Sequence, residues 1–247
     1  MTDEITPPVR ALAAGHVLRW RQDIPRLAPE AVATLFERYR SHSQVEHPST
    51  VLDPCCGNGV VAAVLLVAFA DQVASIEASD VDPDAVVMTS ANLALLTVPE
   101  ALERRLHALE QQRIATDNAR LDEALRDGRR LAERPPSDGP PFRVRQANAL
   151  APESNEENRA TFDLILTDPP YGRRSTWRDA TGAHDGEDRT TLFLEAIVER
   201  LAPNGWIALA IDRDREPLRK GDIPDRLRVV ERLDLPKRSG TLLERIG

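Results

Sequence analysis

Two short stretches of the chain carry residue types suited to chemistry on a nitrogen atom. One follows the apolar run Phe162–Leu166 and is residues 167–172, TDPPYG. It combines a hydrogen-bond-accepting acid, two stiff prolines and an aromatic ring, which suits a flat substrate bearing an NH2 group. The other is residues 53–59, DPCCGNG. Its glycines let the backbone approach a ligand closely, so it suits a nucleotide-like cofactor.

The types of Asp168, Pro169 and Tyr171 predict how a planar amine would be held. An amine conjugated with a ring is a poor nucleophile, because its lone pair is delocalised. The Asp168 carboxylate and the Pro169 carbonyl can accept two N–H groups, which polarises the nitrogen as charge develops. The Tyr171 ring offers a base a stacking face worth about 1–3 kcal/mol. We expect these three residues to form a catalytic slot, with Asp168 as acceptor and positioner.

Two acids, Asp53 and Asp80, each end an expected strand, about one β/α unit apart. An acid at the second position can hold both hydroxyls of a ribose. The glycines also fit the dinucleotide fingerprint, so an NAD-binding oxidoreductase and a non-catalytic nucleotide-binding protein stay open as alternatives. Asp53 would repel a pyrophosphate. It favours a sulfonium cofactor with an amino-acid tail, whose ammonium group seeks an anion.

The elements that must position these residues alternate between strand and helix. Strands are expected at Val51–Leu52, Ala74–Ser79, Phe142–Gln146, Phe162–Leu166, Trp206–Ile211, Arg226–Leu235 and Thr241–Ile246. Helices are expected at Pro29–Arg40, Val60–Ala70, Asp84–Leu96 and Thr191–Leu201. This alternation predicts an α/β fold, with a mostly parallel sheet covered by helices on both faces.

We interpret residues 1–247 as a single domain with two additions. A helical extension occupies about residues 1–45, of which residues 1–9 form a loose end. A helical insertion occupies about residues 99–134 and carries as many acids as arginines. That balance is typical of a solvated helix face with i,i+4 pairs. Turn-forming residues predict a mobile loop over Arg173–Arg189, and a Pro-Lys-Arg-Ser-Gly turn between the last two strands.

Composition excludes some classes of function. A formal net charge of −8 counts against a protein that coats nucleic acid, because such proteins carry a basic surplus. An enzyme with a local basic patch is still allowed. No apolar run reaches the roughly 20 residues that span a bilayer. The adjacent Cys55 and Cys56 have no other cysteine to pair with, which favours a reduced, cytoplasmic protein. The five histidines lack metal-ligand spacing, so we expect no metal site. We also expect no membrane association and a monomer.

Residues 53–59, Asp80 and residues 168–171 together resemble the conserved blocks of class I S-adenosylmethionine-dependent methyltransferases acting on exocyclic or amide nitrogens. The resemblance implies a Rossmann-like, doubly wound, seven-stranded, mostly parallel sheet with an antiparallel last strand. It also implies S-adenosylmethionine as the cofactor.

The same resemblance implies the roles of individual cofactor-binding residues. Asp53 and Gly57 would border the methionine part of the cofactor, within a loop that Cys55 and Gly59 complete. Asp80 would bind the ribose. Asn148, after the strand Phe142–Gln146, would contact the adenine amino group.

A longer pattern is similar to the avilamycin-resistance rRNA methyltransferases of the AviRa type, over most of the chain from about residue 15. It comprises residues 80–83, 92–96, 172–177 and the charged insertion. That family implies methylation of a guanine in 23S rRNA, with the RNA or the large ribosomal subunit as partner, and antibiotic resistance. Pro169 departs from the leucine of that type. Methylation of DNA adenine or of a protein glutamine therefore stays open.

Arg173, Arg174 and Trp177 lie just after the slot in the sequence. A basic and aromatic loop there could bind a phosphate and stack on a splayed base, since RNA is read at loops and bulges. The alternative is a solvated loop with Trp177 in the core. A second cluster, His16, Arg19, Trp20 and Arg21, either caps the site or packs on the surface.

Overall fold

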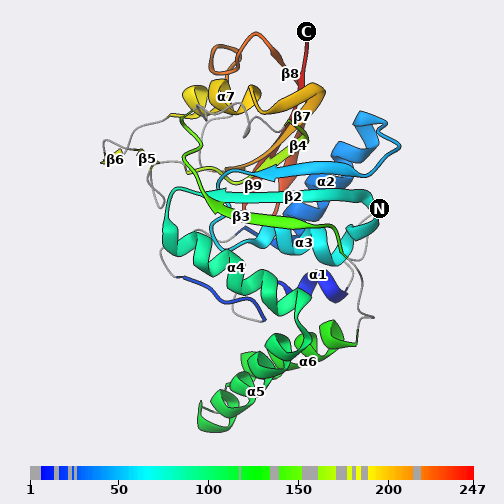
Figure 1. The fold of residues 1–247 in the computed structure, drawn as a ribbon, viewed down its shortest axis with the longest axis vertical. Coiled ribbons are helices and arrows are strands. Elements are labelled where there is room, and N and C mark those ends of the chain that lie inside the picture. The colour runs from blue at the N-terminus through cyan, green and yellow to red at the C-terminus, as the bar shows by residue number, and fades with distance from the viewer. Residues whose placement is uncertain are drawn as a thin grey trace.

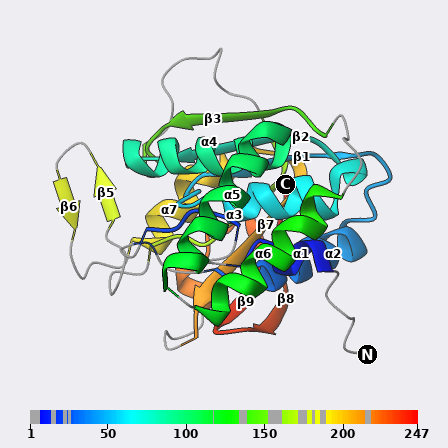
Figure 2. The same cartoon turned by 90° about the horizontal axis from the view of Figure 1, so that it is seen from below.

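The computed structural model describes residues 7–13, 17–21, 24, 27–116, 118–133, 139–151, 161–170, 177–179, 182–184, 189–213 and 218–247. A seven-stranded sheet with the order β3-β2-β1-β4-β7-β9-β8 forms its centre. These strands are β1 (Ser49–Asp53), β2 (Val73–Asp80), β3 (Phe142–Gln146), β4 (Phe162–Thr167), β7 (Leu201–Asp212), β8 (Leu227–Leu235) and β9 (Arg238–Arg245). Figure 2 shows β3 at one edge of the sheet and β8 at the other.

The last strand in the chain is the antiparallel one. β9 pairs antiparallel with both β7 and β8, whereas the pairs among β1, β2, β3, β4 and β7 are parallel. The doubly wound, seven-stranded sheet with an antiparallel last strand is therefore confirmed.

Helices lie on both faces of the sheet, as predicted (Figure 1). The helices are α1 (Pro7–Ala11), α2 (Pro29–Ser43), α3 (Val60–Ala68), α4 (Pro83–Thr97), α5 (Pro99–Thr116), α6 (Ala119–Ala132) and α7 (Thr190–Val198). Side chains alternate along a strand. On β7, Trp206 and Ala208 join the core under α2 and α3, while Ile207 and Leu209 join the core under α7.

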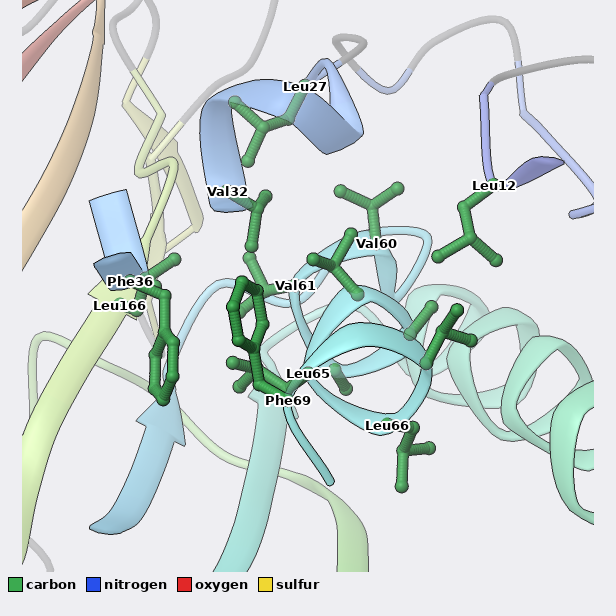
Figure 3. Packing of buried hydrophobic residues seen from close by; sticks show 14 of the residues in the cluster. Leu12, Leu27, Val32, Phe36, Val60, Val61, Leu65, Leu66, Phe69 and Leu166 are labelled. Carbon is green, nitrogen blue, oxygen red and sulfur yellow. The ribbon is translucent and has the colours of Figure 1, made fainter. Parts of the chain in front are cut away.

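Helix α3 is apolar on every side, so it can be enclosed all round by the rest of the protein. All residues from Val60 to Val67 are buried, as expected for a helix covered all round. Figure 3 shows Val61, Leu65 and Phe69 facing α2. There the Phe36 and Phe69 ring centroids are 4.7 Å apart. The packing fixes the start of α3, and with it the loop that leads out of β1.

The predicted helical insertion forms α5 and α6, which lie side by side at one end of the molecule (Figure 1). They enclose a small core of their own, made by Leu109, Leu121, Ala124 and Leu125. Ion pairs such as Arg113–Asp122 at 3.5 Å and Arg129–Glu110 at 3.5 Å lie on its surface. The division into one domain with two additions stays a prediction.

Several local predictions were wrong. Residues 7–11 form α1 rather than a loose end, because Val9 and Ala11 are buried. β7 begins at Leu201, so it includes Pro203, Asn204 and Gly205, where a turn was expected. Within the strand, Asn204 has φ 60°.

Two other connections also differ from the prediction. β8 and β9 are joined by only Pro236 and Lys237. The expected loop over Arg173–Arg189 contains an antiparallel pair, β5 (Trp177–Asp179) and β6 (Gly182–His184). The buried Trp177 anchors this pair.

Among the described residues, no single helix is long and apolar enough to cross a membrane. The bent pair α4 and α5 is the one combination whose length and composition would suffice.

Candidate active site

The loop between β1 and α3 is built on two glycines with left-handed backbones. Gly57 has φ +51° and Gly59 has φ +75°, a conformation that side chains with a Cβ disfavour. A Cβ on Gly59 would also lie 2.9 Å from Thr89 Cγ2 on α4. The Thr89 hydroxyl donates to the Gly57 carbonyl at 3.0 Å. The loop is therefore held against α4, and residue 59 must be glycine.

Asp80 ends β2 and reaches back to this loop. One carboxylate oxygen accepts the Gly57 N–H at 3.0 Å, and the other accepts the Asp82 N–H at 3.0 Å. Burial raises the pKa of Asp80, against these hydrogen bonds. A carboxylate has about four lone-pair sites, so each oxygen can still accept a hydroxyl. Asp80 is thus both a support of the loop and a candidate ribose ligand.

Asp53, at the end of β1, is 1% exposed. Its pKa is raised to about 7, mainly by burial and to a smaller extent by the negative charges of Asp80 and Asp168. The backbone N–H of Cys55, 3.3 Å from Asp53 Oδ1, acts in the opposite direction. A buried acid near neutrality is typical of a functional site, and a cationic ligand would favour its ionised form.

A residue that our sequence reasoning missed, Asn58, lies beside Asp53. Its side chain is buried, and among the described residues neither Nδ2 nor Oδ1 has a hydrogen-bond partner. Buried amides are almost always paired. This one lines a pocket of about 40 Å³ with Asp53, Cys55 and Asp168. Its position between two glycines was visible in the sequence, but its burial and its unpaired atoms were not.

Asp168 follows β4 and enters the same pocket. The Arg238 side chain holds it. Nε of Arg238 lies 3.2 Å from Oδ1, and Nη2 lies 3.0 Å from Oδ2. Pro169, the next slot residue, is buried. Sequence reasoning assigned no role to Arg238, because 70 residues separate it from Asp168.

Asn148 follows β3 and lies near the loop between β1 and α3, residues 53–59, which we call the cofactor loop. Its Oδ1 accepts the Leu150 N–H at 2.9 Å. It lines a pocket of about 180 Å³ together with Pro54 of the loop and Ser79 of β2. The structure therefore places Asn148 beside the ends of β1 and β2, where the adenine contact was predicted.

The predicted RNA-contacting residues have different outcomes. Tyr171, Arg173 and Arg174 lie outside the described residues. Trp177 is 3% exposed and packs on Phe193 with ring centroids 5.3 Å apart. Our interpretation of Trp177 as an exposed stacking ring is not supported by this placement, because its apolar surface is already covered. The core alternative describes it better.

Two members of the N-terminal cluster, Trp20 and Arg21, lie at the site, whereas the Arg19 side chain is exposed. Trp20 lines the pocket with Asp53 and Asp168. Arg21 forms an ion pair with Asp82 at 3.0 Å, just after Asp80. His16 lies outside the described residues. A segment far from the motifs in sequence therefore covers the cofactor loop.

The described side chains at the strand ends lie around two pockets, of about 40 and about 180 Å³, at one edge of the sheet. The ends of β1, β2, β3 and β4 meet there, which is where ligands bind in open α/β sheets. Within the described parts of the chain, no group of three or more His, Cys, Asp or Glu side chains could hold a metal ion. The arrangement offers anionic and amide groups for a cationic cofactor, next to the Asp168 carboxyl group as a hydrogen-bond acceptor for a substrate.

The chain is similar to proteins that methylate RNA. A family profile described as rRNA methyltransferase AviRa matches residues 5–238. A relative from Streptomyces viridochromogenes is named 23S rRNA (guanine(2535)-N(1))-methyltransferase. It is 30% identical over 238 residues, which are 94% of this chain and 93% of the relative.

Solved structures agree with this similarity. The rRNA methyltransferase aviRa from Streptomyces viridochromogenes aligns with a TM-score of 0.75 and 27% identity, covering 95% of this chain and 91% of that one. A putative RNA methyltransferase from Pyrococcus horikoshii aligns with a TM-score of 0.53 and 12% identity, covering 97% of each chain. This second likeness concerns the fold alone.

Proposed function

The chain belongs to the AviRa family of rRNA methyltransferases, and from that premise we propose that it methylates N1 of a guanine in 23S rRNA, with S-adenosylmethionine as methyl donor. The observation that carries the proposal is the shared pocket of the cofactor loop and the Asp168 carboxylate. A methyl donor bound to the loop would face a base held by Asp168.

The described residues fit the cofactor. When bound, it supplies an electrophilic methyl group on a positively charged sulfur. Asp53 and the unpaired Asn58 amide suit the charged amino-acid end. Asp80 can accept the ribose hydroxyls, and Asn148, which lines a pocket with Pro54 and Ser79, can contact the adenine amino group. The left-handed glycines Gly57 and Gly59 allow close approach of the backbone.

The slot suits the N1 edge of guanine. This edge presents the N1–H beside the exocyclic NH2, so it needs two neighbouring acceptors. The Asp168 carboxylate can accept the N1–H, and the Pro169 carbonyl can accept an N–H of the NH2 group. N1 must lose its proton to become nucleophilic, and we assign the role of proton acceptor to the Asp168 carboxylate. A base within an RNA helix would first have to leave the stack.

One experiment tests this function directly. Purified protein is incubated with labelled S-adenosylmethionine and either naked 23S rRNA or large ribosomal subunits. A methyl group at N1 blocks Watson–Crick pairing, so reverse transcription should stop one nucleotide before the modified guanine. Adenine-containing DNA and a glutamine peptide serve as competing substrates. Methylation of either in place of rRNA would contradict the proposal, as would calorimetry showing tight NADH binding and none for S-adenosylmethionine.

A further inference from the structure

The ion pair between Asp168 and Arg238 is more than a surface contact. The side chains are 12% and 10% exposed, respectively. Nε and Nη2 of the guanidinium face the two carboxylate oxygens at 3.2 and 3.0 Å. Such a fork fixes both the position and the rotation of a carboxylate, which a single contact cannot do. Asp168 therefore has a defined orientation before any substrate arrives.

The strand pairing of β9 determines where Arg238 lies relative to Asp168. It is the first residue of β9 and pairs with Asp212, the last residue of β7. The preceding Lys237 has φ 60°, a left-handed conformation that residues with a Cβ adopt mainly in turns. Nη1 of Arg238 donates to the Lys237 carbonyl at 3.2 Å. The left-handed Lys237 thus closes the two-residue turn that brings Arg238 to the start of β9.

The surroundings of Asp168 explain why a cation is needed. Among the described residues that line its pocket, the titratable groups are Asp53, Cys55 and Cys56, and the others are neutral side chains such as Trp20 and Asn58. None of these groups is cationic. A partly buried carboxylate facing another acid would favour its neutral form. A protonated Asp168 could not accept a proton from N1.

We propose that Arg238 is a positioning residue for methyl transfer, which orients the Asp168 carboxylate toward the base and keeps it ionised. This inference rests on the proposed function. In the step, the N1 proton passes to Asp168, the N1 electron pair forms the bond to the methyl carbon, and the carbon–sulfur bond breaks with its electron pair left on sulfur. Once Asp168 is neutral, the guanidinium charge balances the negative charge developing on the base.

The test compares Arg238→Met and Arg238→Lys with the wild-type protein. Arg228→Met is the matched control, because Arg228 is an exposed arginine of the same hairpin that pairs with Glu244. Single-turnover methylation of 23S rRNA is measured from pH 5 to 9, with the cofactor affinity and the urea midpoint alongside. In Arg238→Met we expect a loss of about 100-fold or more in rate, with cofactor affinity within about threefold.

The pH profile separates positioning from structure. In Arg238→Met, the acid limb of the rate should move to higher pH by about one unit or more, because the guanidinium of residue 238 no longer stabilises ionised Asp168. Arg238→Lys keeps the charge but not the fork. It should return the acid limb toward that of the wild type while the rate stays about tenfold low. Arg228→Met should match the wild type throughout.

Each remaining outcome has a definite meaning. An Arg238→Lys or Arg238→Met variant with the wild-type rate and acid limb overturns the role of Arg238. So does a loss of rate in Arg238→Met that follows the loss of stability while the acid limb stays unchanged. If Arg238→Met does not fold, Arg238→Lys decides through its rate: a rate about tenfold low at an unchanged urea midpoint supports the positioning role, and a wild-type rate overturns it. A wild-type protein that binds the cofactor but leaves 23S rRNA unmethylated overturns the proposed function, and this inference with it.

Discussion

The side-chain Nδ2 of Asn92, on α4, donates a hydrogen bond to the backbone carbonyl of Asn58 at 2.8 Å. The same amide donates to the Arg19 carbonyl at 3.0 Å, and its oxygen accepts the Arg19 N–H at 2.8 Å. Asn92 is fully buried. One side chain therefore joins the cofactor loop to the N-terminal segment that covers it.

Replacing Asn92 by alanine should loosen both segments at once. The backbone groups of Asn58 and Arg19 would lose their partners, and each buried unpaired group costs about 1–3 kcal/mol. We expect a lower free energy of unfolding by about 2 kcal/mol and cofactor affinity about tenfold weaker, measured by urea unfolding and calorimetry. Ser90→Ala is the control, because Ser90 on the same helix is exposed and its hydroxyl donates to the Val86 carbonyl one turn earlier. Equal effects of both changes would contradict this role.

The raised pKa of Asp53 predicts how stability depends on pH. The carboxyl has an ordinary value of 3.8 and about 7 in the folded protein. Between these values the native state binds the extra proton, so this contribution to stability is full below about pH 4 and is lost as pH rises to about 7. Asp53→Asn removes the titration. The free energy of unfolding of Asp53→Asn minus that of the wild type should therefore be about 2–4 kcal/mol larger at pH 8 than at pH 4.

The measurement is a set of urea unfolding curves for both proteins at pH 4, 6 and 8, without cofactor. The difference between the variant and the wild type should grow with pH and level off above about 7. A constant difference would show that Asp53 titrates normally. Cofactor affinity should change the other way, with Asp53→Asn binding more weakly at pH 8, because the cationic donor loses an anionic partner.

Asp168 and Asp80 should affect different steps. Asp168→Ala should abolish methyl transfer while cofactor affinity stays within a few-fold, because Asp168 holds the base. Asp80→Ala should mainly weaken cofactor binding, because Asp80 supports the Gly57 backbone and can accept the ribose. Single-turnover rates and calorimetry on both variants test the division. Loss of cofactor binding alone in Asp168→Ala would place that residue in the wrong half of the site.

Gly59→Ala should destabilise the cofactor loop by about 2–4 kcal/mol. The new Cβ would meet a left-handed backbone with φ +75° and lie 2.9 Å from Thr89, and both effects act in the same direction. Thermal unfolding of this variant is compared with Gly221→Ala, whose Cβ would meet no atom within 4 Å. The second variant should unfold close to the wild type. A stable Gly59→Ala protein would mean that the loop can rearrange.

Trp177→Phe distinguishes a core residue from a base-stacking one. The buried ring packs on Phe193, so trimming it should lower the free energy of unfolding by about 1–3 kcal/mol. Methylation at saturating RNA should stay within a few-fold of the wild-type rate. Trp206→Phe, on the opposite face of the sheet, is the matched core control. Activity lost with stability unchanged would restore the stacking role.

Much of the fold was predictable because local patterns specify it. Apolar runs ending in acids located β1 and β2, and the strand before Asp168 was found with nearly its observed bounds. The carboxyl ends of parallel strands meet at one edge, so these acids had to lie close together. The bounds of β7 were missed, because an Asn-Gly pair in the sequence indicates a turn whether or not neighbouring strands pair around it.

The residues that complete the site were not predictable in this way. Arg238, Asn58 and Asn92 have ordinary residue types in ordinary positions, and what distinguishes them is a contact or its absence. Asp168 and Arg238 meet only because β9 inserts between β7 and β8. Trp177 was misjudged for a related reason, since an aromatic among arginines has the same pattern whether it is buried or exposed.

The sequence by itself determined the order of strands and helices, the cofactor loop and the acid of the slot, because these depend on residue type and short-range spacing. Only the tertiary structure decided the orientation of that acid and the arginine that it pairs with, and which segment covers the cofactor loop. Those properties depend on burial and on distances between residues far apart in the chain. Local pattern does not encode such distances, and the packing of the sheet sets them.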